Sequence, residues 1–541
     1  MKNDIYNYVF EDIYNQEEDK EKIAFTFKGE KYTFEEVRLS VNYFSNLLLE
    51  KGIKKGDHVS LLSLNSYNWI IAFFSIIRIG AVAILQNYIL RHNELVNAIK
   101  NSDSSFIIYG KYVASAKDEN DFDKLLKDTN ISLNNTLSIK DINFKEILKD
   151  YKEKILPDYD REEESKRTSY IIFTTGTTSE PKGVMLSQYS VLNIIYHNFY
   201  KLDPIFSDKF MCLLPLFHCY GLLVMLAFAA FKRNVVINEM ADPVKIYKEF
   251  MKEKCGESAS VAVIYDKIAR APFFWLSRGR FTKHCIVGGG FTSEKGFNYL
   301  EKKYGSGKFL NGYGLTECSP LVSLVFPNAP ANKRISTVGK IMDDIEVVIQ
   351  ENNTKEDITH LQKPGEILVK GYVTCNGYYN LPKSKQPFDE NGYLHTGDMG
   401  YFDEDGYLVL TGRIKDIIIR KGENISPAEI EKAFEKYKEF KSVRVLGFPS
   451  FTDGEFIIAA VEIQKKGFVF HEDIYLKDLQ KYLPSIKIPT HIIYMPKFPR
   501  TANGKLDERK LRHICIDRIE TYIDKKLGKE AKKIQKQLGK G

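Results

Sequence analysis

Apolar residues recur with two different spacings along the first part of the chain. Before Gly52 they repeat at helical spacing, and Thr33 and Glu36 stand where the two members of an N-terminal capping box belong. Short apolar runs then predict two buried strands with a buried helix between them, over 58–63, 69–77 and 81–85. Helices and strands that alternate in this way predict a mainly parallel sheet covered by helices.

The pattern changes after the middle of the chain. The alternation first continues, with strands expected over 170–173 and 211–214 and helices over 189–200 and 221–231. After Pro320, short alternating strands separated by Asn, Gly and Pro predict a small β-rich part, for example 346–350 and 366–370. A second break at 412–416 precedes a short strand and a helix, expected over 417–420 and 427–437.

Length and composition limit the class of protein. With 541 residues the chain exceeds one ordinary core, so at least two domains are expected. The longest apolar run, 221–231, is too short to span a bilayer, and the acidic N-terminus has no apolar signal-peptide region. Seven cysteines without a C-x-x-C pair argue against a disulfide framework and a zinc site. We therefore expect a cytoplasmic protein.

One loop carries the strongest chemical signal. The strand expected over 170–173 runs into TTGTTSEPKG, which offers hydroxyl donors, backbone N–H groups and one cation. These groups suit a polyphosphate, and the candidate ATP-binding residues are Thr174, Thr175, Gly176, Thr177, Thr178 and Lys182. The loop is not a Walker A motif, because its lysine precedes the glycine and follows a proline. The alternative is a polar surface hairpin built from ordinary turn residues.

The loop resembles the phosphate-binding signature of the AMP-forming adenylating superfamily, which includes acyl-CoA synthetases, and departs from it at Thr175 and Ser179. The segment NGYGLTECSP resembles the family's second core motif. The resemblance implies that Tyr313 stacks on adenine, that Thr316 contacts the phosphates, and that Glu317 ligates Mg²⁺. A carboxylate with phosphate oxygens and water is a set of ligands that Mg²⁺ prefers.

Later motifs follow in the family's order. The resemblance implies that Asp398, within HTGD, binds the ribose hydroxyls, that Arg413 contacts the nucleotide, and that Lys415 is the hinge. It also makes Lys505, within NGKLD, the catalytic lysine that stabilises charge at the α-phosphate. Gly422 matches the segment that lines the coenzyme A tunnel.

The acyl side of the site is implied by two further segments. By resemblance, His218 in PLFHCYGL lies beside the acyl carboxylate as a third catalytic candidate with Lys505 and Thr316. The triplet Gly288, Gly289 and Gly290 resembles the family's glycine turn, which lets the backbone approach the acyl-adenylate. The neighbourhood of His218 up to Phe231 contains no acidic residue to pair with an α-ammonium group, which favours a fatty or aryl acid over an amino acid.

The family implies an α/β fold with a large N-terminal domain over 1–412, built from two βα-layered subdomains and a small β-barrel-like one. A small, mobile α+β domain over 413–512 would follow. The expected activity joins a carboxylic acid to coenzyme A through an acyl-AMP, with ATP, Mg²⁺ and coenzyme A taking part. Alternatives are an enzyme that loads an acyl carrier protein, and a non-catalytic nucleotide-binding relative.

The end of the chain, 513–541, extends beyond the resemblance. It has eight basic and four acidic residues and therefore carries +4 of the net charge of +7. Because the charges of the remaining chain nearly balance, no nucleic-acid partner is expected. Its apolar residues are spaced by threes and fours, which predicts an amphipathic helix. Such a helix could pack on the C-terminal domain, pair with a second subunit or rest on an anionic membrane.

Overall fold

The computed structural model describes residues 19–90, 92–111, 120–174, 181–202, 207–239, 243–270, 274, 283–289, 294–305, 309–352, 354–420, 423–450, 454–463, 469–501 and 506–518. The chain divides into two units. The first unit comprises Met1–Thr396 and Tyr401–Val409, and the second comprises Gly397–Gly400 and Leu410–Gly541.

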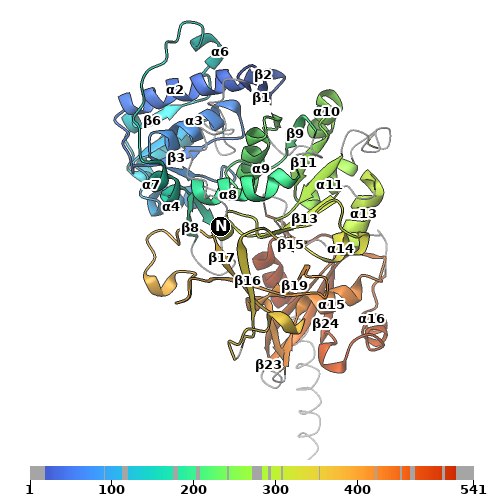
Figure 1. Cartoon of the computed structure of the whole chain (residues 1–541). Helices are drawn as coiled ribbons and strands as arrows, with labels where there is room; N and C mark the ends of the chain where they lie inside the picture. Colours follow the sequence, from blue (N-terminus) through green and yellow to red (C-terminus); the bar gives the residue numbers. More distant parts are fainter. Residues whose placement is uncertain are drawn as a thin grey trace, which may run out of the picture. The chain divides into compact units, whose positions relative to one another are not determined.

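A six-stranded sheet of order β6-β5-β3-β4-β7-β8 forms one layer of the first unit. Neighbouring strands are parallel except for β8, which runs antiparallel to β7. Its strands are β3 (His58–Leu62), β4 (Val82–Leu85), β5 (Phe106–Tyr109), β6 (Thr136–Ser138), β7 (Thr168–Thr174) and β8 (Lys182–Ser187). The helices in this part of the chain are α2 (Phe34–Glu50), α3 (Tyr67–Arg78), α4 (His92–Asn101), α5 (Asn120–Thr129), α6 (Phe144–Ile147), α7 (Arg161–Lys166) and α8 (Gln188–Asn198). Figure 1 shows them in blue to green.

A nine-stranded sheet of order β15-β14-β13-β12-β11-β9-β10-β1-β2 forms the second layer. Its strands are β1 (Ile23–Phe27), β2 (Glu30–Thr33), β9 (Lys209–Cys212), β10 (Asn234–Ile237), β11 (Glu257–Ser260), β12 (His284–Val287), β13 (Phe309–Tyr313), β14 (Ser323–Leu324) and β15 (Lys340–Ile341). The strands from β1 to β13 in this order are parallel. The helices are α9 (Cys219–Ala230), α10 (Pro243–Glu253), α11 (Ala262–Ala269), α13 (Glu294–Tyr304) and α14 (Ala331–Ser336).

The expected βα alternation is confirmed, and side-chain caps account for the starts of α2 and α3. The Thr33 hydroxyl accepts a hydrogen bond from the Glu36 N–H at 3.1 Å, and the Glu36 carboxylate accepts one from the Thr33 N–H at 2.7 Å, so the capping box of α2 is complete. Helix α3 begins two residues before the expected start because the Ser66 hydroxyl caps the Trp69 N–H at 3.0 Å.

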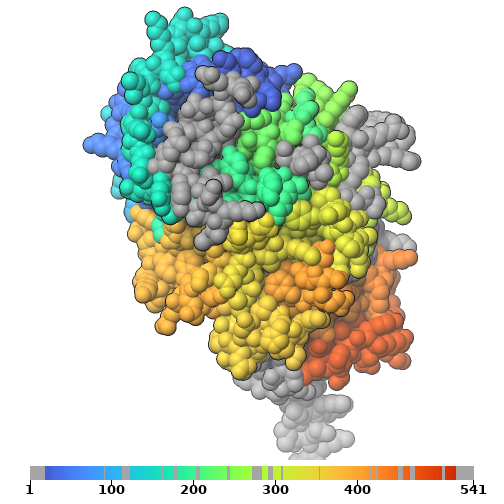
Figure 2. Space-filling model, in the orientation of Figure 1, coloured from blue at the N-terminus to red at the C-terminus, as the bar shows by residue number. Residues whose placement is uncertain are grey.

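A four-stranded sheet of order β16-β17-β18-β19 follows. Its strands are β16 (Ile345–Gln350), β17 (Gly365–Gly371), β18 (Leu394–Phe402) and β19 (Leu408–Arg413). The two strands predicted from alternation are confirmed as the antiparallel pair β16–β17, in which Val347 faces Val369. The β-rich part that was expected to be barrel-like is observed as this sheet. In the first unit, blue, green and yellow segments meet along one continuous surface, so residues distant in sequence build the same body (Figure 2).

The second unit contains a five-stranded sheet with β21-β20-β23-β22 in order and β24 beside β23. Its elements are β20 (Ile418–Arg420), β21 (Glu423–Ile425), α15 (Pro427–Phe434), β22 (Phe440–Ser450), β23 (Gly454–Ile463), α16 (Glu472–Leu479) and β24 (His491–Met495). A last helix covers 508–518 and continues across the expected boundary at residue 512. Cys515 of this helix is fully buried with Leu446 and Phe448. Residues 519–541 lie outside the described part.

All seven cysteines are free and buried. No helix among the described residues is both long enough and apolar enough to cross a bilayer.

Candidate active site

The predicted motifs of the nine-stranded sheet follow the carboxyl ends of parallel strands. Gly288 and Gly289 come directly after β12, and Thr316 and Glu317 come shortly after the neighbouring β13. His218 lies in the segment after β9 and immediately precedes α9. The carboxyl edge of a parallel sheet is the usual place for a ligand in α/β folds, because neighbouring loops converge there.

The described ends of the phosphate loop face each other. Thr174 ends β7, Lys182 begins β8, and the two residues are paired across the antiparallel strands. The Thr174 hydroxyl donates a hydrogen bond to the Lys182 carbonyl oxygen at 3.4 Å. The remaining predicted residues of the loop lie outside the described part, and they are Thr175, Gly176, Thr177 and Thr178.

A glycine fixes the turn that carries Thr316 and Glu317. These residues form the 3-10 turn η6 (Thr316–Cys318). A Cβ atom at Gly314 would lie 1.7 Å from the Pro320 carbonyl oxygen, so no other residue fits while the chain folds back against itself here. Tyr313, predicted to stack on adenine, ends β13 and is 6% exposed.

Lys182 and Glu317, from motifs far apart in sequence, meet at Tyr378. The Lys182 Nζ atom lies over the Tyr378 ring, 4.5 Å from its centroid. The Tyr378 hydroxyl donates a hydrogen bond to Glu317 Oε1 at 2.9 Å. Burial, followed by the charge of Glu317, raises the pKa of Tyr378 above its ordinary value, so the phenol keeps the proton that it donates.

Tyr378 was not predicted from the sequence. Its segment lies beside β8, where the Met185 N–H donates to the Gly377 carbonyl oxygen and the Tyr379 N–H donates to the Gly183 carbonyl oxygen. This pairing brings the tyrosine next to Lys182, which opens β8. The only local signal is the tyrosine pair in NGYYN, and it does not indicate a position in space.

The predicted acyl-side residues also converge. The Cys219 thiol, next to His218, donates a hydrogen bond to the Thr316 hydroxyl at 3.5 Å. A Cβ atom on Gly288 would lie 3.5 Å from both the Tyr220 ring and the Gly312 carbonyl oxygen. The Tyr220 hydroxyl is buried and has no hydrogen-bond partner among the described residues. It is a second residue beside the predicted glycines that sequence reasoning did not single out. Gly290 lies outside the described part.

Two predicted nucleotide-binding residues of the second unit bind each other. Arg413 Nε lies 2.9 Å from Asp398 Oδ1, and Asp398 is largely buried whereas Arg413 is half exposed. Lys415 lies in the 3-10 turn η9 (Ile414–Asp416), directly after Arg413. Gly422 and Lys505 are outside the described residues.

The residues present fit a magnesium ion held jointly with a nucleotide. Among the described residues no three His, Cys, Asp or Glu side chains are grouped to hold a metal. Glu317 therefore offers a single carboxylate. Mg²⁺ in nucleotide sites commonly takes one or two carboxylates and fills its remaining positions with phosphate oxygens and water.

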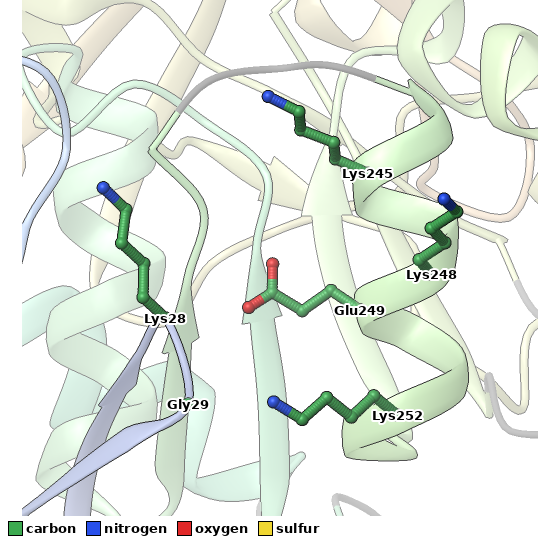
Figure 3. Close-up of a pocket in the computed structure, with 6 residues that line it drawn as sticks. All are labelled: Lys28, Gly29, Lys245, Lys248, Glu249 and Lys252. Atoms are coloured by element: carbon green, nitrogen blue, oxygen red, sulfur yellow. The ribbon is translucent and has the colours of Figure 1, made fainter.

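A pocket of about 310 Å³ lies elsewhere in the first unit. Figure 3 shows Glu249 and Lys252 extending from α10 toward the turn that carries Lys28 and Gly29. The lining is rich in lysine, but Lys28 is already paired with Glu239 at 2.8 Å. None of the predicted site residues lines this pocket, so it forms no wall of the candidate active site.

Comparisons with known proteins identify the family and the fold of the chain. A 2-succinylbenzoate–CoA ligase of Oceanobacillus iheyensis is 28% identical over 515 residues, which cover 91% of this chain and 96% of that protein. An oxalate–CoA ligase of Saccharomyces cerevisiae is 33% identical over 357 residues, 64% of this chain and 63% of that protein. The ATP-bound structure of MatB from Rhodopseudomonas palustris has a TM-score of 0.82 at 22% identity, over 94% of this chain and 98% of that one, and confirms the expected α/β fold class. The family model described as "AMP-binding enzyme" matches residues 13–379, and the chain belongs to that family.

Proposed function

We propose that this chain is an ATP-dependent acid–thiol ligase, which forms an acyl-AMP from a carboxylic acid and then transfers the acyl group to coenzyme A. The observation that carries the proposal is the meeting of Lys182 and Glu317 at Tyr378. A cation for phosphates stands beside a carboxylate for Mg²⁺, in a chain of the AMP-binding enzyme family. The relatives named as CoA ligases support coenzyme A as the thiol, in preference to a carrier protein.

In the first step, a carboxylate oxygen of the acid attacks the α-phosphorus of ATP. The bond from that phosphorus to the bridging oxygen breaks, and pyrophosphate leaves with the electron pair. Lys182 and the Thr174 hydroxyl bind phosphate oxygens, and Lys505 stabilises the charge that develops at the α-phosphate. Mg²⁺, when bound at Glu317, neutralises phosphate charge. In this proposal Asp398 and Arg413 bind the ribose and the nucleotide.

In the second step, the sulfur of coenzyme A attacks the acyl carbonyl carbon and AMP leaves as the phosphate monoester. His218 and the backbone at Gly288 and Gly289 lie beside the acyl group, and Gly422 lines the path of the thiol. The proposed domain division, 1–412 and 413–512, assigns Gly422 and Lys505 to the smaller domain. For the tail over 513–541, packing on the C-terminal domain, pairing with a second subunit and contact with an anionic membrane remain predictions.

A fatty or aryl acid is the proposed substrate class. Helix α9, which follows His218, is apolar and carries no acidic side chain to meet an α-ammonium group. Burying an unpaired ammonium costs several kcal/mol, about 2 or more powers of ten in affinity. The related ligases are named for different acids, 2-succinylbenzoate and oxalate, so the particular acid is not carried over.

A pyrophosphate-release assay over a panel of acids tests this assignment. We expect fatty or aryl acids to support release at least about 100-fold better, in kcat/KM, than the α-amino acids of similar size, because only the latter bring an unpaired charge. The control is the same reaction mixture with the acid omitted. A preference for any α-amino acid over its des-amino analogue would overturn the proposed substrate class.

A further inference from the structure

Tyr378 contacts both the cation and the carboxylate of the candidate site. We propose that it is a positioning residue, which keeps Lys182 and Glu317 from neutralising each other and leaves both available to Mg²⁺·ATP. The inference rests on the proposed function and deepens it, because it names the part of the fold that keeps the phosphate and metal contacts ready.

The two charged groups use different parts of the tyrosine. Lys182 lies over the face of the ring, 4.5 Å from its centroid, where the ring quadrupole attracts a cation. Glu317 accepts the hydroxyl hydrogen bond at the edge of the ring, at 2.9 Å. Both charged residues are described, and no ion pair within 4.0 Å joins them directly. The tyrosine therefore contacts two opposite charges that would attract each other strongly at contact distance.

The backbone of Tyr378 is held by several contacts, and the residue is buried. The Tyr378 N–H donates to Gln386 Oε1 at 2.7 Å, and Gln386 Nε2 donates back to the Tyr378 carbonyl oxygen at 3.0 Å. Val184 of β8 forms a β-bridge with Tyr378, whose side chain and backbone together are 8% exposed. Because the backbone is fixed from two sides and the residue is buried, the position of Tyr378 is built into the fold.

Glu317 is held from a second direction as well. The Cys375 N–H donates to the Glu317 carbonyl oxygen at 2.8 Å, so the segment that carries Tyr378 also fixes the backbone of the metal-binding candidate. The tyrosine hydroxyl donates to Oε1 of the Glu317 carboxylate, which also has a second oxygen, Oε2. That second oxygen is the one we assign to the metal.

Equilibrium binding of ATP, measured by isothermal titration in excess Mg²⁺ and again in EDTA, tests the proposal without turnover. Tyr378→Phe keeps the ring beneath Lys182 and removes only the hydroxyl. It should weaken Mg²⁺·ATP binding about tenfold, the usual effect of losing a hydrogen bond to a charged group, and change metal-free ATP binding by less than about twofold. Tyr379→Phe is the matched control, because the Tyr379 hydroxyl donates to Asp103 at 2.8 Å and to neither charged group. This variant should change the affinity in neither titration by more than about twofold.

A second pair of variants tests the separation itself. Tyr378→Leu removes the ring and should weaken metal-free ATP binding about tenfold, because Lys182 then pairs with Glu317. Adding Glu317→Gln to this variant should restore metal-free binding to within about twofold of the wild type.

The outcomes separate this inference from the function on which it rests. Three results would each overturn the positioning role. In the first, Tyr378→Phe weakens ATP binding equally with and without Mg²⁺. In the second, Tyr379→Phe weakens it as much as Tyr378→Phe does, and in the third, Glu317→Gln does not rescue metal-free binding in Tyr378→Leu. A wild-type chain that bound no ATP under either condition would instead overturn the proposed function.

Discussion

Replacing Lys505 with alanine is expected to slow acyl-AMP formation by about 10²–10³-fold, the usual cost of removing one group that stabilises transition-state charge. Two anions, the attacking carboxylate and the α-phosphate, must come together in that step, and the lysine lowers their repulsion. Transfer of the acyl group from supplied acyl-AMP to coenzyme A contains no such encounter, so it should continue at a similar rate. Pyrophosphate release and thioester formation from synthetic acyl-AMP measure the two steps separately.

Two variants make the Lys505 result specific. Lys497→Ala removes an exposed lysine of the same unit and should leave both steps unchanged. Gly422→Leu should do the reverse of Lys505→Ala, because a side chain in the thiol path blocks the second step alone. Equal failure of Lys505→Ala and Gly422→Leu in both steps would contradict separate roles for the two residues.

The second large effect is expected in the stability of the second unit. Arg444 on β22 lies 3.3 Å from Asp416 of η9, 3.3 Å from Glu431 of α15 and 3.0 Å from Glu508 of the last helix. Arg444→Met should lower the free energy of unfolding of this unit by about 3 kcal/mol, because it leaves a partly buried cluster of carboxylates without its cation. Lys487→Met, which breaks the exposed pair with Glu429, should cost less than about 1 kcal/mol.

The loss of unfolding free energy caused by Arg444→Met should grow as the pH rises. Burial raises the pKa of Glu431 above its ordinary value of 4.5, while Arg444 lowers it. Without Arg444 the folded-state pKa rises further, so the native state binds more protons than the unfolded state between pH 4.5 and that higher value. Stability therefore falls with increasing pH across this window.

Amide hydrogen exchange in β22 and β23 gives the local free energy of opening. Tryptophan fluorescence does not serve, because the sequence of the second unit contains no tryptophan. A loss in Arg444→Met that is the same at pH 5 and pH 8 would show that the effect comes from packing and not from the unpaired carboxylates.

Local elements were predictable because their causes lie within a few residues. The capping box of α2 needs only Thr33 and Glu36, and the pair β16–β17 needs only alternation and turn residues. The predicted ends of helices were less accurate, because a hydroxyl cap such as Ser66 can start a helix before the apolar run. Strand order was not predictable: β1 lies beside β10, and no local pattern indicates a partner so distant in sequence.

The residues of the candidate site were likewise predictable only where a local motif identifies them. Motif residues such as Lys182 and Glu317 could be selected because the family resemblance attaches a role to each. Tyr378 could not, because its position depends on a short segment that pairs with β8 from far along the chain. Arg444 was missed for the same reason, since its three carboxylate partners come from separate elements.

The most direct test of the central claim is the identity of the nucleotide product. Enzyme, Mg²⁺, ATP, coenzyme A and the best acid of the panel are incubated together, and the products are separated by chromatography. The account predicts AMP, pyrophosphate and acyl-CoA in equal amounts, with no AMP when the acid is omitted. ADP and inorganic phosphate in place of AMP and pyrophosphate would contradict attack at the α-phosphorus, and with it the proposed function.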